Sequence, residues 1–165
     1  MRRFLLAGLF FISQSAFSGE VANLYQEGAF GAKWGDSMER LKEVIPAGKR
    51  ENYKEVVMYV TRDGRTLFDI ERKKNAFITF GFDPQQRLNS IAVDFQIENY
   101  DQLLDNLDKQ FGPHTMVSDD NAARIATWPK DSGIELSLTM SRAGFFSQEV
   151  KTSLNILYTG KPKIK

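Results

Sequence analysis

The sequence predicts an α+β protein, built as a mainly antiparallel sheet with two helices packed on it. Two segments place apolar residues at the spacing of one helix face, whereas most of the remaining chain alternates apolar and polar residues. Short turn sequences such as Asp83-Pro84 separate the alternating runs, which is typical of antiparallel strands. No Pro-, Gly- or Ser-rich linker interrupts residues 19–165, so we expect them to form a single α+β domain.

The clearest element is a helix over residues 99–111. Its apolar stripe falls at i, i+3, i+4, i+7 and i+11 and consists of Tyr100, Leu103, Leu104, Leu107 and Phe111. Asn99 is placed to cap the first turn, and Gly112-Pro113 is placed to end the helix.

A shorter helix is predicted to begin near Asp36-Ser37, because either side chain can accept hydrogen bonds from the free N–H groups of a first turn. Its apolar face consists of Met38, Leu41, Val44 and Ile45. Pro46 and Gly48 end it.

The strands are predicted from period-two alternation. The strongest runs are Ile134 to Met140 and Ile91 to Ile97, each with one face buried. Weaker runs occupy residues 56–60, 66–72, 76–82, 123–128 and 152–158. Asp63-Gly64 is expected to join the first two weaker runs as a hairpin.

The two halves of the chain share an order of elements. A helix near residue 36 is followed by strands, and a helix near residue 99 is again followed by strands. Residue identity between the halves is slight, so two interpretations stay open: a duplicated helix-β-β-β unit, or two unrelated α+β halves.

Residues 1–18 predict a cleavable signal peptide. Arg2 and Arg3 precede an unbroken apolar run over residues 4–12, which is shorter than the roughly 20 residues that a transmembrane helix needs. Small residues precede the cut in Ala16-Phe17-Ser18, so Gly19 is the expected first residue of the mature protein. We therefore expect export to the periplasm or secretion after cleavage near Ser18.

Composition excludes several classes of partner and chemistry. The chain has no cysteine, so it offers no lipid acceptor, no disulfide and no thiolate ligand, and no stable membrane anchor is expected. Loss of Arg2 and Arg3 leaves 20 basic against 21 acidic side chains and changes the formal charge from +1 to −1. Nucleic acid is therefore not an expected partner. No phosphate-binding loop is present, and neither a cofactor nor a metal is expected.

The single histidine offers an alternative, catalytic interpretation of the sequence. His114 follows the predicted helix end, with Ser118, Asp119 and Asp120 close by in the sequence, and a cell-envelope hydrolase could use such groups. The chain has no Gly-x-Ser-x-Gly elbow, and a loop histidine is more often simply solvated. No catalytic residue is therefore assigned.

Aromatic residues outside the regular patterns are the candidates for binding. Tyr25 and Trp34 lie among glycines before the first helix, where core packing is favoured over exposure. Phe145 and Phe146 are adjacent in a connection between strands, so both cannot easily face inward. Either one is presented to a partner or both cover the sheet edge.

The second half carries a resemblance to known families through the helix of Leu103 to Phe111, its Gly112-Pro113 end, and strands ending at Trp128, Met140 and Tyr158. The segment Phe30 to Ser37 also looks like the entry to the helix in such units. The pattern resembles the helix-then-three-strand unit found singly in the small lipoprotein of the outer-membrane β-barrel assembly machinery and in tandem in the β-lactamase inhibitor protein family. This chain lacks the lipid-bearing cysteine of the first and the disulfide cysteines of the second. The resemblance implies a non-catalytic protein-binding surface.

The leading expectation is thus a non-enzymatic exported protein that binds another protein of the cell envelope or periplasm. An inhibitor, an immunity protein and an envelope-assembly accessory protein all fit this description. The alternatives are the hydrolase centred on His114 and a carrier of a small apolar ligand between helix and sheet.

Overall fold

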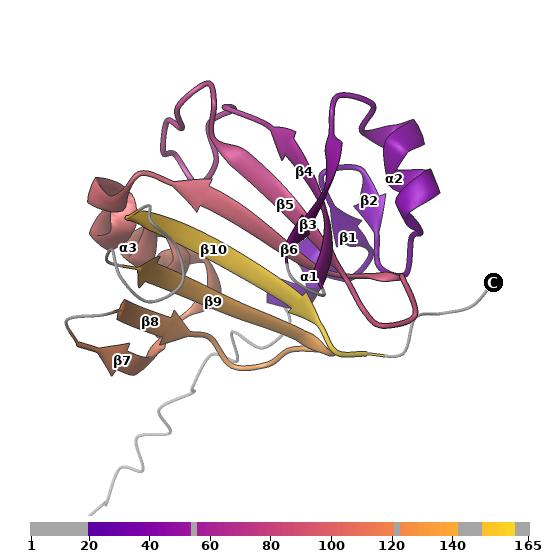
Figure 1. The fold of residues 1–165 in the computed structure, drawn as a ribbon. Helices are drawn as coiled ribbons and strands as arrows, with labels where there is room; N and C mark the ends of the chain where they lie inside the picture. The colour runs from indigo at the N-terminus through magenta and orange to yellow at the C-terminus, as the bar shows by residue number, and fades with distance from the viewer. Residues whose placement is uncertain (1–19, 54–55, 121–122, 142–149, 161–165) are drawn as a thin grey trace, which may run out of the picture.

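The computed structural model describes residues 20–53, 56–120, 123–141 and 150–160. Its main feature is one antiparallel sheet of eight strands, in the order β3-β4-β5-β6-β10-β9-β8-β7 (Figure 1). The strands are β3 (Lys49–Tyr53), β4 (Val56–Arg62), β5 (Phe77–Phe82), β6 (Leu88–Phe95), β7 (Thr115–Asp119), β8 (Ala123–Thr127), β9 (Ile134–Ser141) and β10 (Lys151–Tyr158). The α+β class with a mainly antiparallel sheet is therefore confirmed.

The helices and two short strands complete the described chain. They are α1 (Glu20–Tyr25), β1 (Gly28–Ala29), β2 (Ala32–Lys33), α2 (Met38–Val44), the 3-10 turn η1 (Ile97–Asn99) and α3 (Tyr100–Phe111). Helices α1 and α3 contact each other and β9, and both lie behind the sheet in Figure 1. In the described part of the chain, no helix is long and apolar enough to cross a membrane.

The core lies between the helices and one face of the sheet. The predicted stripe of α3 is buried, and β9 buries every second residue from Ile134 to Met140. Helix α2 covers the far end of the same face, where Leu41 is fully buried and the hydroxyl of buried Tyr59 donates to the carbonyl of Ile45 at 2.7 Å. Periodicity thus predicted the buried residues of α3 and β9.

The helix ends agree with the sequence in part. The Ser37 side chain accepts from the N–H of Arg40 at 3.3 Å, as the first turn of α2 requires. Gly112 ends α3 with φ 84°, a conformation that favours glycine. The predicted cap by Asn99 is wrong: Asn99 is helical and makes no side-chain capping bond, because η1 already leads the chain into α3.

The predicted strand over residues 66–72 and the hairpin at Asp63-Gly64 are also wrong. Strand β4 pairs with β5, and residues 63–76 form a connection in which Leu67 and Ile70 make an isolated bridge. The alternation has another cause here: Ile70 and Arg72 are both buried as the connection folds back against the sheet. Two strands, β3 and β7, were not predicted, because edge strands expose both faces and do not alternate.

The order of elements repeats in the two halves. Helix α2 is followed by the meander β3 to β6, and α3 is followed by the meander β7 to β10, so each unit is one helix and four strands rather than three. The units join where β6 pairs with β10, with Ala92 opposite Asn155. One row of paired residues crosses the whole sheet through this point: Lys49, Val60, Thr79, Ala92, Asn155, Ser137, Thr127 and Thr115. Residues of this row that lie the same number of strands away from the join between β6 and β10 occupy equivalent positions in the two units.

Candidate functional site

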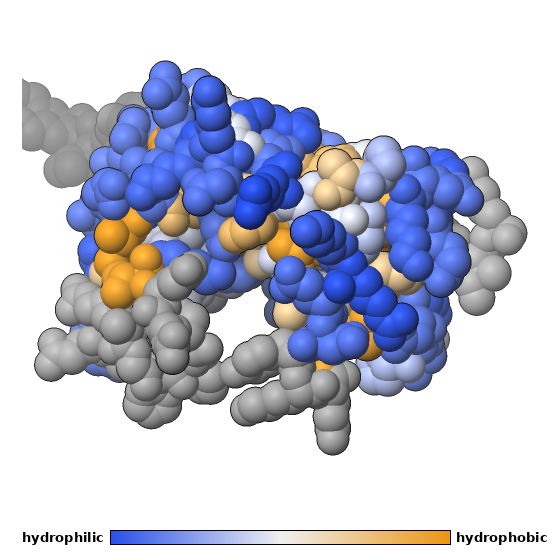
Figure 2. Space-filling view, turned by 45° about the horizontal axis from the view of Figure 1, so that its top comes forward, coloured by the Kyte–Doolittle hydropathy of each residue, from blue (hydrophilic) through white to orange (hydrophobic). Residues whose placement is uncertain are grey.

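The face of the sheet that points away from the helices is the candidate site, and we call it the open face. Paired residues of neighbouring strands point to the same side, so the row through Ala92 and Asn155 lies on this face. No described helix covers it. Seen from another direction, the described residues form a mostly hydrophilic surface with limited hydrophobic areas (Figure 2). From Val60 to Thr127 the residues of the row are nonetheless only partly exposed, because the strands lie side by side and shield one another. The face therefore offers a continuous surface rather than separate projecting side chains.

A hollow of about 440 Å³ lies on the open face over strands β3 to β6 and β10. On the first half of the sheet it is lined by the apolar residues Met58, Val60 and Phe77, together with Glu51 of β3. Its floor consists of the small or polar residues Thr79, Ala92, Ser153 and Asn155. Short side chains keep the floor low, so side chains of another molecule can approach the sheet closely.

Two charged residues beside the floor, Asp94 and Lys151, neutralise one another. One carboxylate oxygen of Asp94 accepts the hydroxyl of Ser153 at 2.7 Å, and the other lies 2.9 Å from the ammonium of Lys151. The Ser153 proton is thus directed to a carboxylate, and Lys151 is an ion-pair partner rather than a base. The pairing of Asp94 with Lys151 thus leaves no net charge at this part of the hollow.

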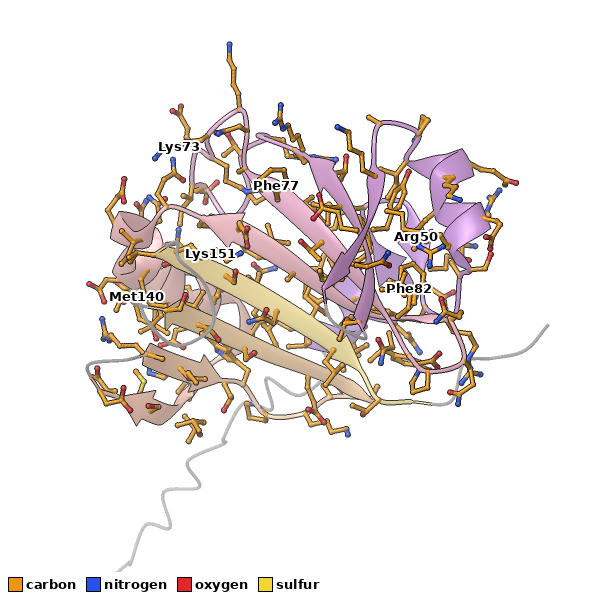
Figure 3. The ribbon with its side chains drawn as sticks, in the orientation of Figure 1. Arg50, Lys73, Phe77, Phe82, Met140 and Lys151 are labelled. Atoms are coloured by element: carbon orange, nitrogen blue, oxygen red, sulfur yellow. The ribbon has the colours of Figure 1, made fainter. Side chains whose placement is uncertain are left out.

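A second hollow, of about 270 Å³, lies at the end of the sheet where β6 ends and β5 and β10 begin. It shares Phe77, Asp94 and Lys151 with the first hollow, so the two are adjacent. Figure 3 shows Lys73, Phe77 and Lys151 together at this end, with Arg50 at the opposite end beside α2. We call this second hollow the end pocket.

Buried Arg72 fixes the walls of the end pocket. Its Nε donates to the carbonyl of Asp94 at 2.9 Å and its Nη2 donates to the carbonyl of Phe77 at 2.8 Å, while the guanidinium lies over the ring of Phe95. Burial lowers the pKa of Arg72, against the attraction of Asp63 and Asp94, which raises it. The cation ties the connection over residues 63–76 to the strand ends, so the pocket is already formed in the free protein.

The aromatic candidates before α2 are packed. Tyr25 is 6% exposed and lies against Phe111, and burial raises its pKa. Trp34 is half-buried, donates from Nε1 to the carbonyl of Tyr25 at 2.7 Å, and stacks on Tyr158 with ring centroids 5.5 Å apart. This is the core packing that the sequence favoured. Phe145 and Phe146 lie outside the described residues.

The histidine is not brought to the acids that sequence reasoning considered with it. His114 Nδ1 lies 2.9 Å from Asp108, on the last turns of α3. Ser118 donates to Asp120 at 3.1 Å, and Asp119 pairs with Arg124. In the part of the chain that the structure describes, no cluster of three or more His, Asp or Glu side chains could hold a metal ion.

Sequence reasoning missed the residues of the open face. Alternation had placed Asp94 on the polar side of its strand, and the same rule applies to Ser153 and Asn155 on the last predicted strand. The missing information was which strands are neighbours, since Asp94 lies 59 residues from Ser153 in the chain.

Comparison with known proteins finds no match to a family model, a curated protein or a solved structure.

Proposed function

We propose that this is an exported, non-enzymatic protein that acts by binding another protein of the cell envelope or periplasm, as an inhibitor, immunity protein or envelope-assembly accessory. The open face is its contact surface. The observation that carries the proposal is a sheet of eight strands with the described helices on one side and the other side uncovered. An antiparallel sheet needs only one covered face, so the second face is available for binding.

The size of the open face fits a protein partner. Eight strands spaced by about 4.8 Å give a width of about 34 Å, and strands of five to eight residues give a length of about 17–27 Å. The face is thus on the order of 700 Å², close to the roughly 800 Å² that one partner contributes to a stable protein–protein interface. A small ligand would use only a fraction of this surface.

The resemblance to the tandem units of the β-lactamase inhibitor protein family and to the assembly-machinery lipoprotein supports the same proposal. Those families bind proteins without catalysis, and here too a helix-plus-sheet unit is repeated. The repeat is one strand longer in each half than the pattern expected from the sequence.

The contacts of the polar groups favour binding over the hydrolase alternative. His114 lines neither the hollow on the open face nor the end pocket, and Ser118, which lies near it in the sequence, donates to Asp120 instead. A carrier of an apolar ligand would need a pocket between helix and sheet. The open-face hollow and the end pocket instead lie at the surface.

Site-specific photo-cross-linking in the producing cell tests the proposed function. p-Benzoylphenylalanine in place of Asn155 places the reactive group at the centre of the open face, and the same amino acid in place of Asp105 places it on the exposed side of α3 as a matched control. We expect one discrete adduct from position 155 and none from position 105. Equal labelling from both positions, or no adduct from either, contradicts the proposal.

Export is tested separately by intact-mass measurement of the protein recovered from the native host's periplasm or medium. We expect a mature chain that begins at Gly19. A protein that retains Met1 contradicts the proposed cleavage.

A further inference from the structure

The end pocket has apolar walls that the fold leaves accessible. Phe77 is 36% exposed and Val150 is 43% exposed, and they border the hollow together with Ile97, Phe95 and Ala76. Single exposed apolar residues are common, but two that line one hollow beside a proposed contact surface indicate a place for an apolar group.

The charges around the end pocket balance one another. Lys73 and Lys151 lie on its border with Asp94 and Glu98, two cations with two anions. Asp94 and Lys151 already form an ion pair at 2.9 Å. An entering ion loses its hydration and meets no net opposite charge in return, so the border favours a neutral group over an ion.

The size and polarity of the end pocket further limit which neutral group can bind there. A hollow of about 270 Å³ is large for an aliphatic side chain, and the exposed ring of Phe77 in its wall favours another ring, because aromatic pairs are more stable than their buried area alone predicts. The polar border offers partners to an N–H or O–H at the tip of such a ring. Tyrosine and tryptophan combine an apolar body with a donor and are the residues that most often anchor protein interfaces.

We propose that the end pocket binds one tyrosine or tryptophan side chain presented by the protein that occupies the open face. This inference rests on the proposed function and specifies the chemistry of the partner. Because the pocket is adjacent to the hollow on the open face and shares three residues with it, the anchoring residue lies at the edge of the interface and not apart from it. Arg72 keeps the pocket preformed, so the anchor binds without the cost of ordering the connection over residues 63–76.

Blocked amino acids serve as probes of the pocket without any knowledge of the partner. The ¹⁵N-labelled protein, purified after expression of the full chain, is titrated with N-acetyltryptophanamide and N-acetyltyrosinamide, with N-acetylleucinamide as the control. We expect saturable shifts of the backbone amides of Phe77, Ile97 and Lys151, and binding of the leucine probe weaker by about 2- to 10-fold. Equal affinity for the leucine probe, or no shift with either aromatic probe, overturns the inference.

Two substitutions locate the binding. Phe77→Ala removes one wall and is expected to abolish the shifts, whereas Val117→Ala, at an apolar residue 63% exposed on β7, should leave them unchanged. If Phe77→Ala lowers the melting temperature markedly, Val150→Ser provides the same test on the other wall. Loss of the shifts with Val117→Ala as well contradicts the pocket assignment. An adduct from position 155 without any probe binding refutes the pocket while the proposed function stands.

Discussion

The two halves of the sheet are alike on the buried side and unlike on the open face. Phe80 of the first half is equivalent to Leu138 of the second half, and both are fully buried. On the open face, Val60 is equivalent to Thr127, and Phe77 to Glu135. The fold therefore requires apolar residues only on the helix side, and the two halves differ on the other side. Both described hollows of the candidate site lie mainly on the first half.

The largest expected effect tests whether the buried sides are truly equivalent. Phe80→Ala and Leu138→Ala each empty space in the core, and we expect losses of about 3–5 and 2–5 kcal/mol in the free energy of unfolding. The measurement is urea denaturation followed by circular dichroism and by tryptophan fluorescence. Because β6 pairs with β10 across the join, both variants should unfold in a single transition. Two separate transitions would show that the halves are independent domains.

Sequence reasoning predicted the buried sides well, for a physical reason. The stripe of α3 and the alternation of β9 depend only on neighbours in the chain, and both were correct. The connection over residues 63–76 was misread because Leu67 and Ile70 are apolar for packing against the core. They pair only with each other, in an isolated bridge, and not with a strand of the sheet. The open face depends on register between distant strands: Lys151 and Ser153 reach Asp94 across 57 and 59 residues. Local patterns carry no information about such pairs.

The next prediction concerns buried Arg72, whose hydrogen bonds hold the connection over residues 63–76 in the first half. Substitution Arg72→Met leaves the carbonyls of Asp94 and Phe77 without their donors, and we expect a loss of about 2–4 kcal/mol in the free energy of unfolding. Denaturation with urea measures it. The exposed neighbour Lys73→Met is the control and should change stability by less than about 0.5 kcal/mol. If both substitutions have the same small effect, the connection is not held by Arg72.

A smaller effect of pH is expected at the start of the same connection. Burial raises the pKa of Asp63, but its hydrogen bonds and ion pair with Arg65 and the charge of Arg72 outweigh burial and lower it. A carboxyl with a lowered pKa in the folded state contributes stability above its unfolded pKa of about 3.9, and that stability is lost as the pH falls through the folded pKa. Stability at pH 7 should thus fall by about 1 kcal/mol in Asp63→Asn, with a smaller difference at pH 2.5. A difference that does not depend on pH contradicts this assignment.

The smallest expected effect on stability is the most direct test of the comparison between the halves. Val60→Thr and Thr127→Val exchange residues of nearly equal shape at equivalent positions of the open face, so each should change the free energy of unfolding by less than about 0.5 kcal/mol. Binding should respond differently. A hydroxyl at position 60 meets the partner's apolar surface without a hydrogen-bond partner, and a cost of about 1 kcal/mol lowers affinity about fivefold.

The yield of the adduct from position 155 measures this difference between the two exchanges. Threonine in place of Val60 should reduce the yield, whereas valine in place of Thr127 should not, because the apolar wall of the hollow is contributed by the first half. Equal losses from both exchanges would mean that the partner covers both halves alike. The difference in residues between the two halves of the open face would then have no bearing on recognition.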